Sequence, residues 1–253
     1  MSAVRRDVRD SFSRAAARYD RHAGFQRTTA LTLWSGVAPD AAPGQVVDVG
    51  CGTGHGTRLM RSRWPSARFV AVDFAQSMLA ACGTGNRLCA DAEALPLAGA
   101  SVDFFWSSLT LQWCDVSRFA REAARVLRPG GRLAVSTLGP ATFDELRCAF
   151  AAVDRRRHTI DFHDRATVAE AFAEAGLEIV AVRGDEVTCD YPALVDLLAS
   201  VRGLGANRVR GDNRRTGLMG KEAWRRFADA YETLRTPRGL PLTYETIFLH
   251  AEK

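Results

Sequence analysis

Lysine is almost missing from this chain. It occurs only at positions 221 and 253, so arginine supplies 34 − 2 = 32 of the basic residues. Such a bias usually follows genome composition, which makes any single arginine weak evidence of function. The net charge of +5 and the pI near 9.1 would suit an acidic partner. No recognised motif with interleaved aromatics accompanies the basic residues, so we expect no nucleic acid as partner.

Long apolar runs and metal-site spacings are also absent. No stretch of 18 apolar residues occurs, and the N-terminus has no apolar signal core. We therefore expect neither membrane insertion nor Sec export, and a cytoplasmic protein. The six cysteines form no C-x-x-C pair, which favours reduced thiols. His158 and His163 do not have the spacing of a helical metal site, and we expect no metal.

A glycine-rich turn follows the apolar run Gln45–Val47. The run from Asp48 to Gly54 reads D-V-G-C-G-T-G, which predicts a buried strand, a tight turn and then a helix. Alternating glycines let a ligand approach the backbone and allow conformations that other residues avoid. His55 stands where a dinucleotide fingerprint requires glycine, and no lysine is near enough for a phosphate loop. The acidic Asp48 suits a cationic ligand instead.

Strands and helices then alternate. The run Arg68–Asp73 predicts a second strand, with Asp73 at its tip, 21 residues after Gly52. A carboxylate there could accept both hydroxyls of a ribose, or it could cap the helix 75–81, and the two roles are compatible. Further strands are expected from residue 87, over 101–108 and over 132–137, the last after a helix end and turn at 125–131.

The rest of the chain is expected to frame a site. Residues 1–40 have apolar positions at helical spacing and predict one or two helices that form a lid. Beyond the fifth strand, the patterns predict helices at 141–153 and 166–175, a strand at 177–190, a mostly helical insertion at 193–236 and a last strand at 243–250.

The glycine turn resembles motif I of the class I methyltransferases that use S-adenosylmethionine (SAM). Other motifs, spread over almost the whole chain, resemble the malonyl-acyl carrier protein O-methyltransferase family of biotin synthesis. They include Tyr19-Asp20, Leu111 to Cys114 (L-Q-W-C), Glu145 to Arg147 (E-L-R) and Gly239 to Glu245 (G-L-P-L-T-Y-E). Assembly factors of respiratory complex I share the fold and parts of these motifs but act on a protein.

The resemblance implies an α/β, Rossmann-like class I methyltransferase fold. Its seven-stranded, mostly parallel sheet would have helices on both faces, an N-terminal helical lid and a helical insertion before the last strand. We expect a single domain, 1–253, divided into a lid (1–40), a SAM-binding core (41–190), a helical substrate cap (191–240) and a final strand (241–253).

The resemblance also implies transfer of a methyl group from SAM to the free carboxylate of malonyl-acyl carrier protein, with malonyl-coenzyme A open as a substitute. A carboxylate is already ionised at neutral pH, so no general base is needed. Another small carboxylate, a quinone precursor or a protein partner remain alternative targets. The arginine excess over 202–226 would meet the acidic carrier protein.

Site residues follow from the same resemblance. Arg147 is expected to hold the malonyl carboxylate, with Tyr19, Gln112 and Trp113 lining the transfer site. Arg147 could instead be a surface arginine, and the two aromatic residues could be core packing. Asp91 is expected to accept a hydrogen bond from the adenine amino group. The full set of expected SAM contacts is Asp48, Gly50, Cys51, Gly52, Gly54, Asp73, Phe74, Asp91, Ala92, Glu93 and Ser107.

Overall fold

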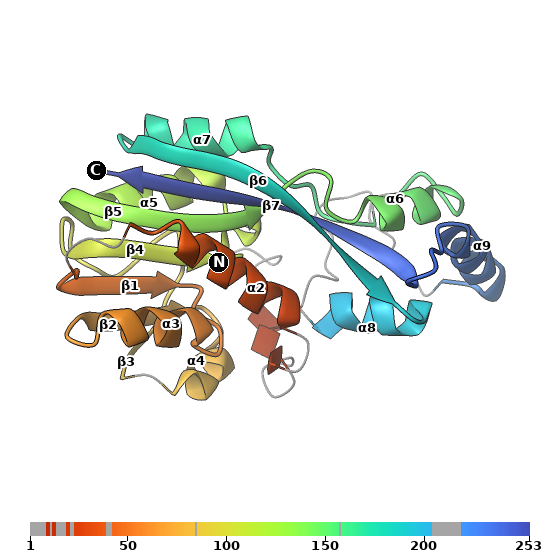
Figure 1. Ribbon diagram of the computed structural model, residues 1–253, viewed down its shortest axis with the longest axis horizontal. Helices are drawn as coiled ribbons and strands as arrows, with labels where there is room; N and C mark the ends of the chain where they lie inside the picture. Colours follow the sequence, from red (N-terminus) through yellow and green to blue (C-terminus); the bar gives the residue numbers. More distant parts are fainter. Residues whose placement is uncertain are drawn as a thin grey trace.

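A seven-stranded sheet forms the centre of the molecule (Figure 1). The computed structural model describes residues 9–10, 12–13, 19–20, 23–38, 42–83, 85–156, 158–203 and 219–253. The strand order is β3-β2-β1-β4-β5-β7-β6, with β1 to β5 parallel and β7 antiparallel to both of its neighbours. The strands are β1 Gln45–Val49, β2 Arg68–Asp73, β3 Asn86–Cys89, β4 Val102–Ser108, β5 Leu127–Leu138, β6 Glu178–Tyr191 and β7 Leu240–Glu252. The expected mostly parallel sheet is confirmed.

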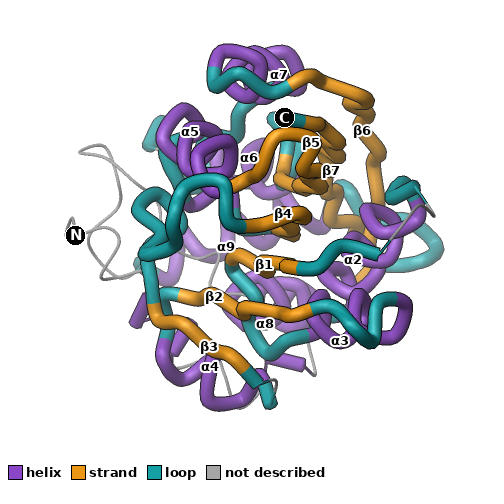
Figure 2. The backbone as a smooth tube through the Cα atoms, turned by 90° about the vertical axis from the view of Figure 1, so that its left-hand side faces the viewer, coloured by secondary structure: helices purple, strands orange, loops and turns teal. Residues whose placement is uncertain are grey.

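Helices cover both faces of the sheet. Helices α5 and α7 lie on one face, and α2 and α3 lie on the other (Figure 2). The helices are α2 Gly24–Ser35, α3 His55–Arg63, α4 Gln76–Cys82, α5 Val116–Val126, α6 Asp144–Ala151, α7 Arg165–Glu174, α8 Leu194–Gly203 and α9 Lys221–Glu232, with a 3₁₀ turn η1 at Leu111–Trp113. None of these helices is long and apolar enough to cross a bilayer.

Side chains of β4 pack on both faces of the sheet. Phe105 packs against Phe119 of α5, with ring centroids 5.7 Å apart. Phe104 and Trp106 face the opposite side, where Phe104 meets Trp64 at 5.0 Å. Successive side chains of a strand point to opposite faces, so a strand covered by helices on both sides is apolar throughout.

The far end of the long β6–β7 pair carries a second core, at the right of Figure 1. Helices α6, α8 and α9 enclose it, and Phe227 and Tyr231 of α9 are fully buried there. Phe25 of α2 stacks on Tyr244 of β7 at 4.1 Å, which joins this end to the first described helix. The second core includes α6, which the expected cap, 191–240, leaves out.

Two element boundaries differ from expectation. Strand β5 begins at Leu127, where a turn was predicted, because the register with β4 shifts and the extra residues continue as strand. Gly130 and Gly131 there exchange backbone hydrogen bonds with Lys253. Helix α6 begins only at Asp144, since residues 139–142 form a separate turn that β7 holds.

Candidate active site

The glycine turn has the backbone shape that the sequence predicted. Gly50, Gly52 and Gly54 all have positive φ, at 73°, 53° and 85°. A Cβ on Gly50 would lie 1.8 Å from Thr110 Oγ1, and one on Gly54 would lie 2.6 Å from Cys82 Sγ. Gly54 therefore lets the turn pack against α4, and it borders neither of the two cavities described below.

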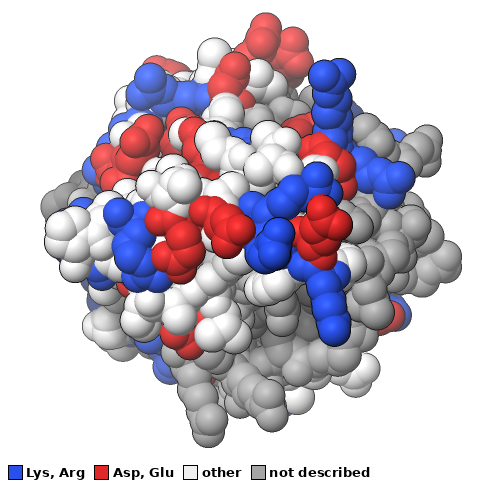
Figure 3. All heavy atoms as spheres, turned by 90° about the vertical axis from the view of Figure 1, so that its right-hand side faces the viewer, with Lys and Arg blue, Asp and Glu red and all other residues white. Residues whose placement is uncertain are grey.

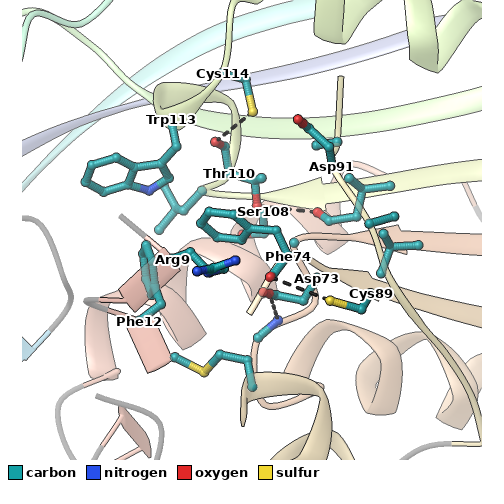
Figure 4. Close-up of a pocket in the computed structure, with 18 of the residues that line it drawn as sticks. Arg9, Phe12, Asp73, Phe74, Cys89, Asp91, Ser108, Thr110, Trp113 and Cys114 are labelled. Carbon is teal, nitrogen blue, oxygen red and sulfur yellow. Dashed lines mark hydrogen bonds between the residues drawn. The ribbon is translucent and has the colours of Figure 1, made fainter. Parts of the chain in front are cut away.

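The first of two cavities lies over the carboxyl ends of β1, β2 and β4 (Figure 4). We call it the apolar cavity; its volume is about 250 Å³. Its walls are mainly apolar side chains, joined by two carboxylates, Asp73 and Asp91. Gly50 and Gly52 form part of its floor, so ligand atoms there would meet bare backbone.

Asp73 links the glycine turn to the residues that precede α4. One of its carboxylate oxygens accepts a hydrogen bond from the Gly52 N–H at 3.0 Å, and the other accepts one from the Ala75 N–H at 2.8 Å. The side chain thus fixes the glycine turn and the start of α4 while it borders the apolar cavity. Burial raises the pKa of Asp73 to about 6, although the two backbone hydrogen bonds oppose this rise.

Aromatic rings close one side of the apolar cavity. The ring of Phe12 lies 5.7 Å from Trp113, 6.3 Å from Phe74 and 6.5 Å from Tyr19. Arg9 borders the same cavity (Figure 4). Sequence reasoning selected the other three aromatic residues but treated Phe12 as helix packing and overlooked Arg9. The run Ser11 to Arg14 (S-F-S-R), which also resembles the family, was the sequence signal that includes Phe12.

The second cavity lies on the other side of the glycine turn. We call it the polar cavity; its volume is about 210 Å³, and it shares Tyr19, Gly50, Gly52 and Ser108 with the apolar cavity. Its remaining walls come from the turn, α2, α3 and β4. They are Asp20, Ala23, Gln26, Arg27, Ala30, Asp48, Cys51, Thr53, His55, Gly56, Arg58 and Trp106.

Three ionisable side chains, Tyr19, Asp48 and Cys51, line the polar cavity. Asp48 accepts a hydrogen bond from the Thr57 hydroxyl at 2.6 Å, and burial raises the pKa of Asp48 to about 7. Burial also raises the pKa of Tyr19, with the charges of Asp73 and Asp20 adding to the rise. A hydrogen bond with Cys82 and burial raise the pKa of Cys51. Tyr19 and Cys51 therefore stay protonated at neutral pH.

Strand alternation decides which serine reaches the site. Ser107, an expected SAM contact, is fully buried, and its hydroxyl donates to the carbonyl oxygen of Val49 at 2.8 Å. The next residue, Ser108, borders both cavities. The sequence located the strand correctly, but residue 108, not 107, is on the cavity side.

Three more expected residues lie outside the cavity walls. Glu93 accepts a hydrogen bond from the Asp115 N–H at 2.7 Å and so fixes the start of α5. Gln112 donates to the carbonyl oxygen of Leu109 and accepts from the Thr137 hydroxyl. Arg147, on α6, donates to the carbonyl oxygens of Pro140 and Thr142 and to the Asp144 carboxylate.

Two glutamates link the segments around Arg147. Glu145 of α6 accepts hydrogen bonds from the N–H and the hydroxyl of Thr243 on β7. Glu245 of β7 accepts one from the Ala141 N–H, in the turn before α6. The partners are 98 and 104 residues apart in the chain. The E-L-R and T-Y-E segments thus meet the turn before α6 in one hydrogen-bond network beside the carboxyl end of β5.

The predicted docking arginines at 208, 210, 214 and 215 lie outside the described residues. On the neighbouring helix α9, Lys221, Arg225 and Arg226 are exposed together with Glu222. Figure 3 shows this end of the molecule, where the described basic side chains are interspersed with acidic ones. Within the described ranges, no group of three His, Cys, Asp or Glu side chains could hold a metal ion.

Sequence comparisons identify the family of this chain, and solved structures share its fold. Residues 47–135 match a methyltransferase domain family. The chain is 45% identical to malonyl-acyl carrier protein O-methyltransferase of Dechloromonas aromatica, over 97% of this chain and 94% of that protein. It is 38% identical to the biotin biosynthesis bifunctional protein BioHC of Cellvibrio japonicus, over 96% of this chain and 49% of that protein. A solved geranyl diphosphate methyltransferase in complex with SAM has a TM-score of 0.53 at 16% identity, covering 89% of this chain and 84% of that one.

Proposed function

This chain belongs to the malonyl-acyl carrier protein O-methyltransferase family, and from that premise we propose that it methylates the free carboxylate of malonyl-acyl carrier protein. SAM supplies the methyl group: a carboxylate oxygen forms a bond to the methyl carbon as the sulfonium bond breaks, which leaves a methyl ester and S-adenosylhomocysteine. We assign the product to biotin synthesis, because one relative is named a biotin biosynthesis bifunctional protein.

The apolar cavity is suited to an adenosine group. Its aromatic and aliphatic walls would cover the base, and Asp91, which borders the cavity, would accept from the adenine amino group. Asp73 borders the cavity, and its two carboxylate oxygens have more acceptor sites than its two backbone hydrogen bonds use, which fits an acceptor for ribose hydroxyls. One observation supports the proposal most: Gly50 and Gly52 expose their backbone to the apolar cavity, and the Asp73 carboxylate borders the same cavity.

Positioning and dehydration would supply the catalysis. Carboxylate and sulfonium lose their charges as they react, so a site with little water favours the transition state. Phe12, Tyr19 and Trp113 surround the cavity and would exclude water, and Tyr19, kept protonated by burial, would present a neutral hydroxyl. No side chain has to remove a proton, and no metal is required.

We place the malonyl group on the β5 side of the site, beside Arg147. The network of Glu145 and Glu245 fixes the turn that leads into α6, and the Arg147 guanidinium is anchored to two carbonyl oxygens of that turn. The side chain stays 35% exposed, so part of the fork remains accessible to a carboxylate.

Mass spectrometry of malonyl-acyl carrier protein incubated with SAM tests the proposal. We expect an added methyl group on the malonyl carboxylate and formation of S-adenosylhomocysteine. Carrier protein without malonyl is the matched control and should stay unmodified. SAM binding without S-adenosylhomocysteine formation on malonyl-carrier protein would favour an assembly factor, whereas turnover of a free carboxylate alone would point to a different acceptor.

A further inference from the structure

Leu109 has an unusual backbone conformation beside the apolar cavity. It follows the last residue of β4, and its φ is 56°. This left-handed conformation is unfavourable for leucine, because the Cβ atom crowds the backbone. Ala100 and Phe143, the other two non-glycine residues with positive φ in the described chain, border neither cavity. A strained residue at a ligand cavity persists only where its surroundings hold it.

Three contacts hold Leu109. Its N–H donates to the carbonyl oxygen of Ser136 on β5 at 3.0 Å. Its carbonyl oxygen accepts a hydrogen bond from Nε2 of Gln112 at 2.8 Å. Its side chain packs against the second core. The contact with Gln112 is the one among these three that a neighbouring side chain supplies through a hydrogen bond.

Gln112 is itself fixed by β5. The hydroxyl of Thr137, a buried residue of that strand, donates to Gln112 Oε1 at 3.3 Å. The acceptor end of the amide thus faces Thr137 while the donor end faces Leu109, and the two bonds determine the orientation of the amide. Gln112 borders neither cavity, so it links β5 to Leu109 from behind the cavity wall.

The segment that Gln112 holds forms one wall of the apolar cavity. Residues 108–114 supply Ser108, Leu109, Thr110, Trp113 and Cys114 to this wall (Figure 4). Thr110 also lies against the glycine turn, since a Cβ on Gly50 would be 1.8 Å from Thr110 Oγ1. A change in the backbone of Leu109 would therefore shift the wall relative to the glycine turn.

We propose that Gln112 is a positioning residue for the cofactor: it holds Leu109 in the left-handed conformation and so keeps residues 108–114 against the adenosine of SAM. This inference rests on the proposed function. Gln112 acts through Leu109 and does not contact the malonyl group. Loss of its hydrogen bond should therefore weaken cofactor binding and leave KM for malonyl-carrier protein unchanged.

Calorimetry with S-adenosylhomocysteine tests the inference without an acceptor. Gln112→Met keeps the length of the side chain but loses both hydrogen bonds, and Gln112→Glu keeps an acceptor for Thr137 but has no donor for Leu109. We expect both variants to bind S-adenosylhomocysteine ~10-fold more weakly, with a similar rise in KM for SAM. KM for malonyl-carrier protein should change by less than about twofold.

Gln76→Met is the matched control. It makes the same chemical change at an exposed position of α4 that borders neither cavity. Its affinity for S-adenosylhomocysteine should equal that of the wild type. Thermal melting confirms that each variant is folded.

A second substitution separates positioning from a general effect on folding. Asparagine adopts positive φ more readily than leucine, so Leu109→Asn should lessen the need for Gln112. In the Leu109→Asn background, Gln112→Met should weaken S-adenosylhomocysteine binding by less than about threefold, against ~10-fold in the wild type. Leu109→Gly serves if Leu109→Asn does not fold. Equal losses in the two backgrounds would overturn the inference.

Two further outcomes would overturn it. One is unchanged affinity for S-adenosylhomocysteine in folded Gln112→Met and Gln112→Glu. The other is a raised KM for malonyl-carrier protein at unchanged cofactor affinity, which would place Gln112 at the acceptor. Failure of the proposed function would look different: the wild type would form no methyl ester on malonyl-carrier protein, while S-adenosylhomocysteine would still bind and the Gln112 variants would still lose affinity.

Discussion

The two sides of the site are built in different ways. On the β1–β2 side, the glycine turn and Asp73 follow consecutive, directly paired strands, and the Gly52 N–H donates to the Asp73 carboxylate. On the β5–β7 side, Glu145 and Glu245 bridge segments 98 and 104 residues apart. One side is set by local sequence, and the other exists only after the whole chain has folded.

This contrast has a functional consequence that can be measured. Substitutions on the β1–β2 side should change binding of SAM, whereas substitutions on the β5–β7 side should change use of the malonyl substrate and leave SAM binding intact. A clean separation of the two effects would support the placement of the two substrates, and a mixed response would contradict it.

The largest effect is expected from Gly50→Ala. Its methyl group would meet Thr110 at 1.8 to 2.7 Å, and the residue would have to keep a φ of 73°. We expect a loss of about 2–4 kcal/mol in the free energy of unfolding and at least ~100-fold weaker SAM binding. Denaturant titration and calorimetry measure the two quantities.

Gly130→Ala is the control for the backbone strain alone. Gly130 has nearly the same φ, 74°, but nothing lies within 4 Å of an added Cβ, and it borders neither cavity. It should cost about 1 kcal/mol in stability and leave SAM affinity unchanged. Equal losses of SAM affinity in the two variants would show that the close contact with Thr110 is unimportant.

On the opposite side, Arg147→Lys should lower kcat/KM for malonyl-carrier protein by ~10- to 100-fold, and Arg147→Ala should lower it further. Lysine keeps the charge but loses the planar fork, which in this structure also holds Pro140 and Thr142. SAM affinity should stay the same in both variants. Steady-state kinetics at saturating SAM, with calorimetry for SAM, separates the two responses.

The network residue Glu145 should give a smaller effect of the same kind. Glu145→Ala leaves the N–H and hydroxyl of Thr243 without their acceptor and loosens α6. We expect KM for malonyl-carrier protein to rise by about fivefold to tenfold, with a smaller rise in Glu145→Gln, which keeps one acceptor oxygen. Glu170→Ala, exposed on α7, is the control. An unchanged KM in Glu145→Ala would show that the hydrogen bonds of Glu145 do not help to position the malonyl substrate.

The same contrast explains what the sequence could predict. The strands, the turn and Asp73 were predictable because strand alternation and glycine spacing are local patterns. Ser107 was the expected contact, whereas Ser108 borders the cavity, since a sequence locates a strand but not which of its faces borders the site. Gln26, Arg27 and His55 were missed because their meeting depends on how α2 packs beside the glycine turn.

The family motifs were predictable only in part. The E-L-R and T-Y-E segments were recognised by resemblance, but nothing in their spacing indicates that Glu145 bonds Thr243 or that Glu245 bonds Ala141. The arginine excess over 202–226 remains a prediction, because most of it lies outside the described residues. Sequence composition suggests such a docking surface, while its geometry depends on the fold.

The smallest expected effect is a pH dependence confined to the β1–β2 side. Asp48 and Asp73 have pKa values raised by burial, to about 7 and about 6. A cationic ligand prefers the ionised carboxylates, so SAM affinity should be greatest above pH 7 and fall as pH drops through these values. From Asp48 alone we expect about a threefold loss between pH 7.5 and 6.5.

Stability should respond with the opposite sign. The folded pKa of Asp48 lies above its unfolded value of 3.8, so its protonated form favours the folded state, and that contribution is lost as pH rises from about 4 through about 7. Asp48→Asn should therefore be more stable than the wild type at pH 8, on the order of 1–3 kcal/mol, yet bind SAM more weakly and with a flatter pH profile. The Thr57 hydroxyl can still donate to the asparagine oxygen, so the turn keeps its hydrogen bond. Calorimetry and denaturant titration across pH 5.5–8.5 measure both responses. If Asp48→Asn is less stable than the wild type at pH 8, burial of the ionised Asp48 carboxylate does not destabilise the fold.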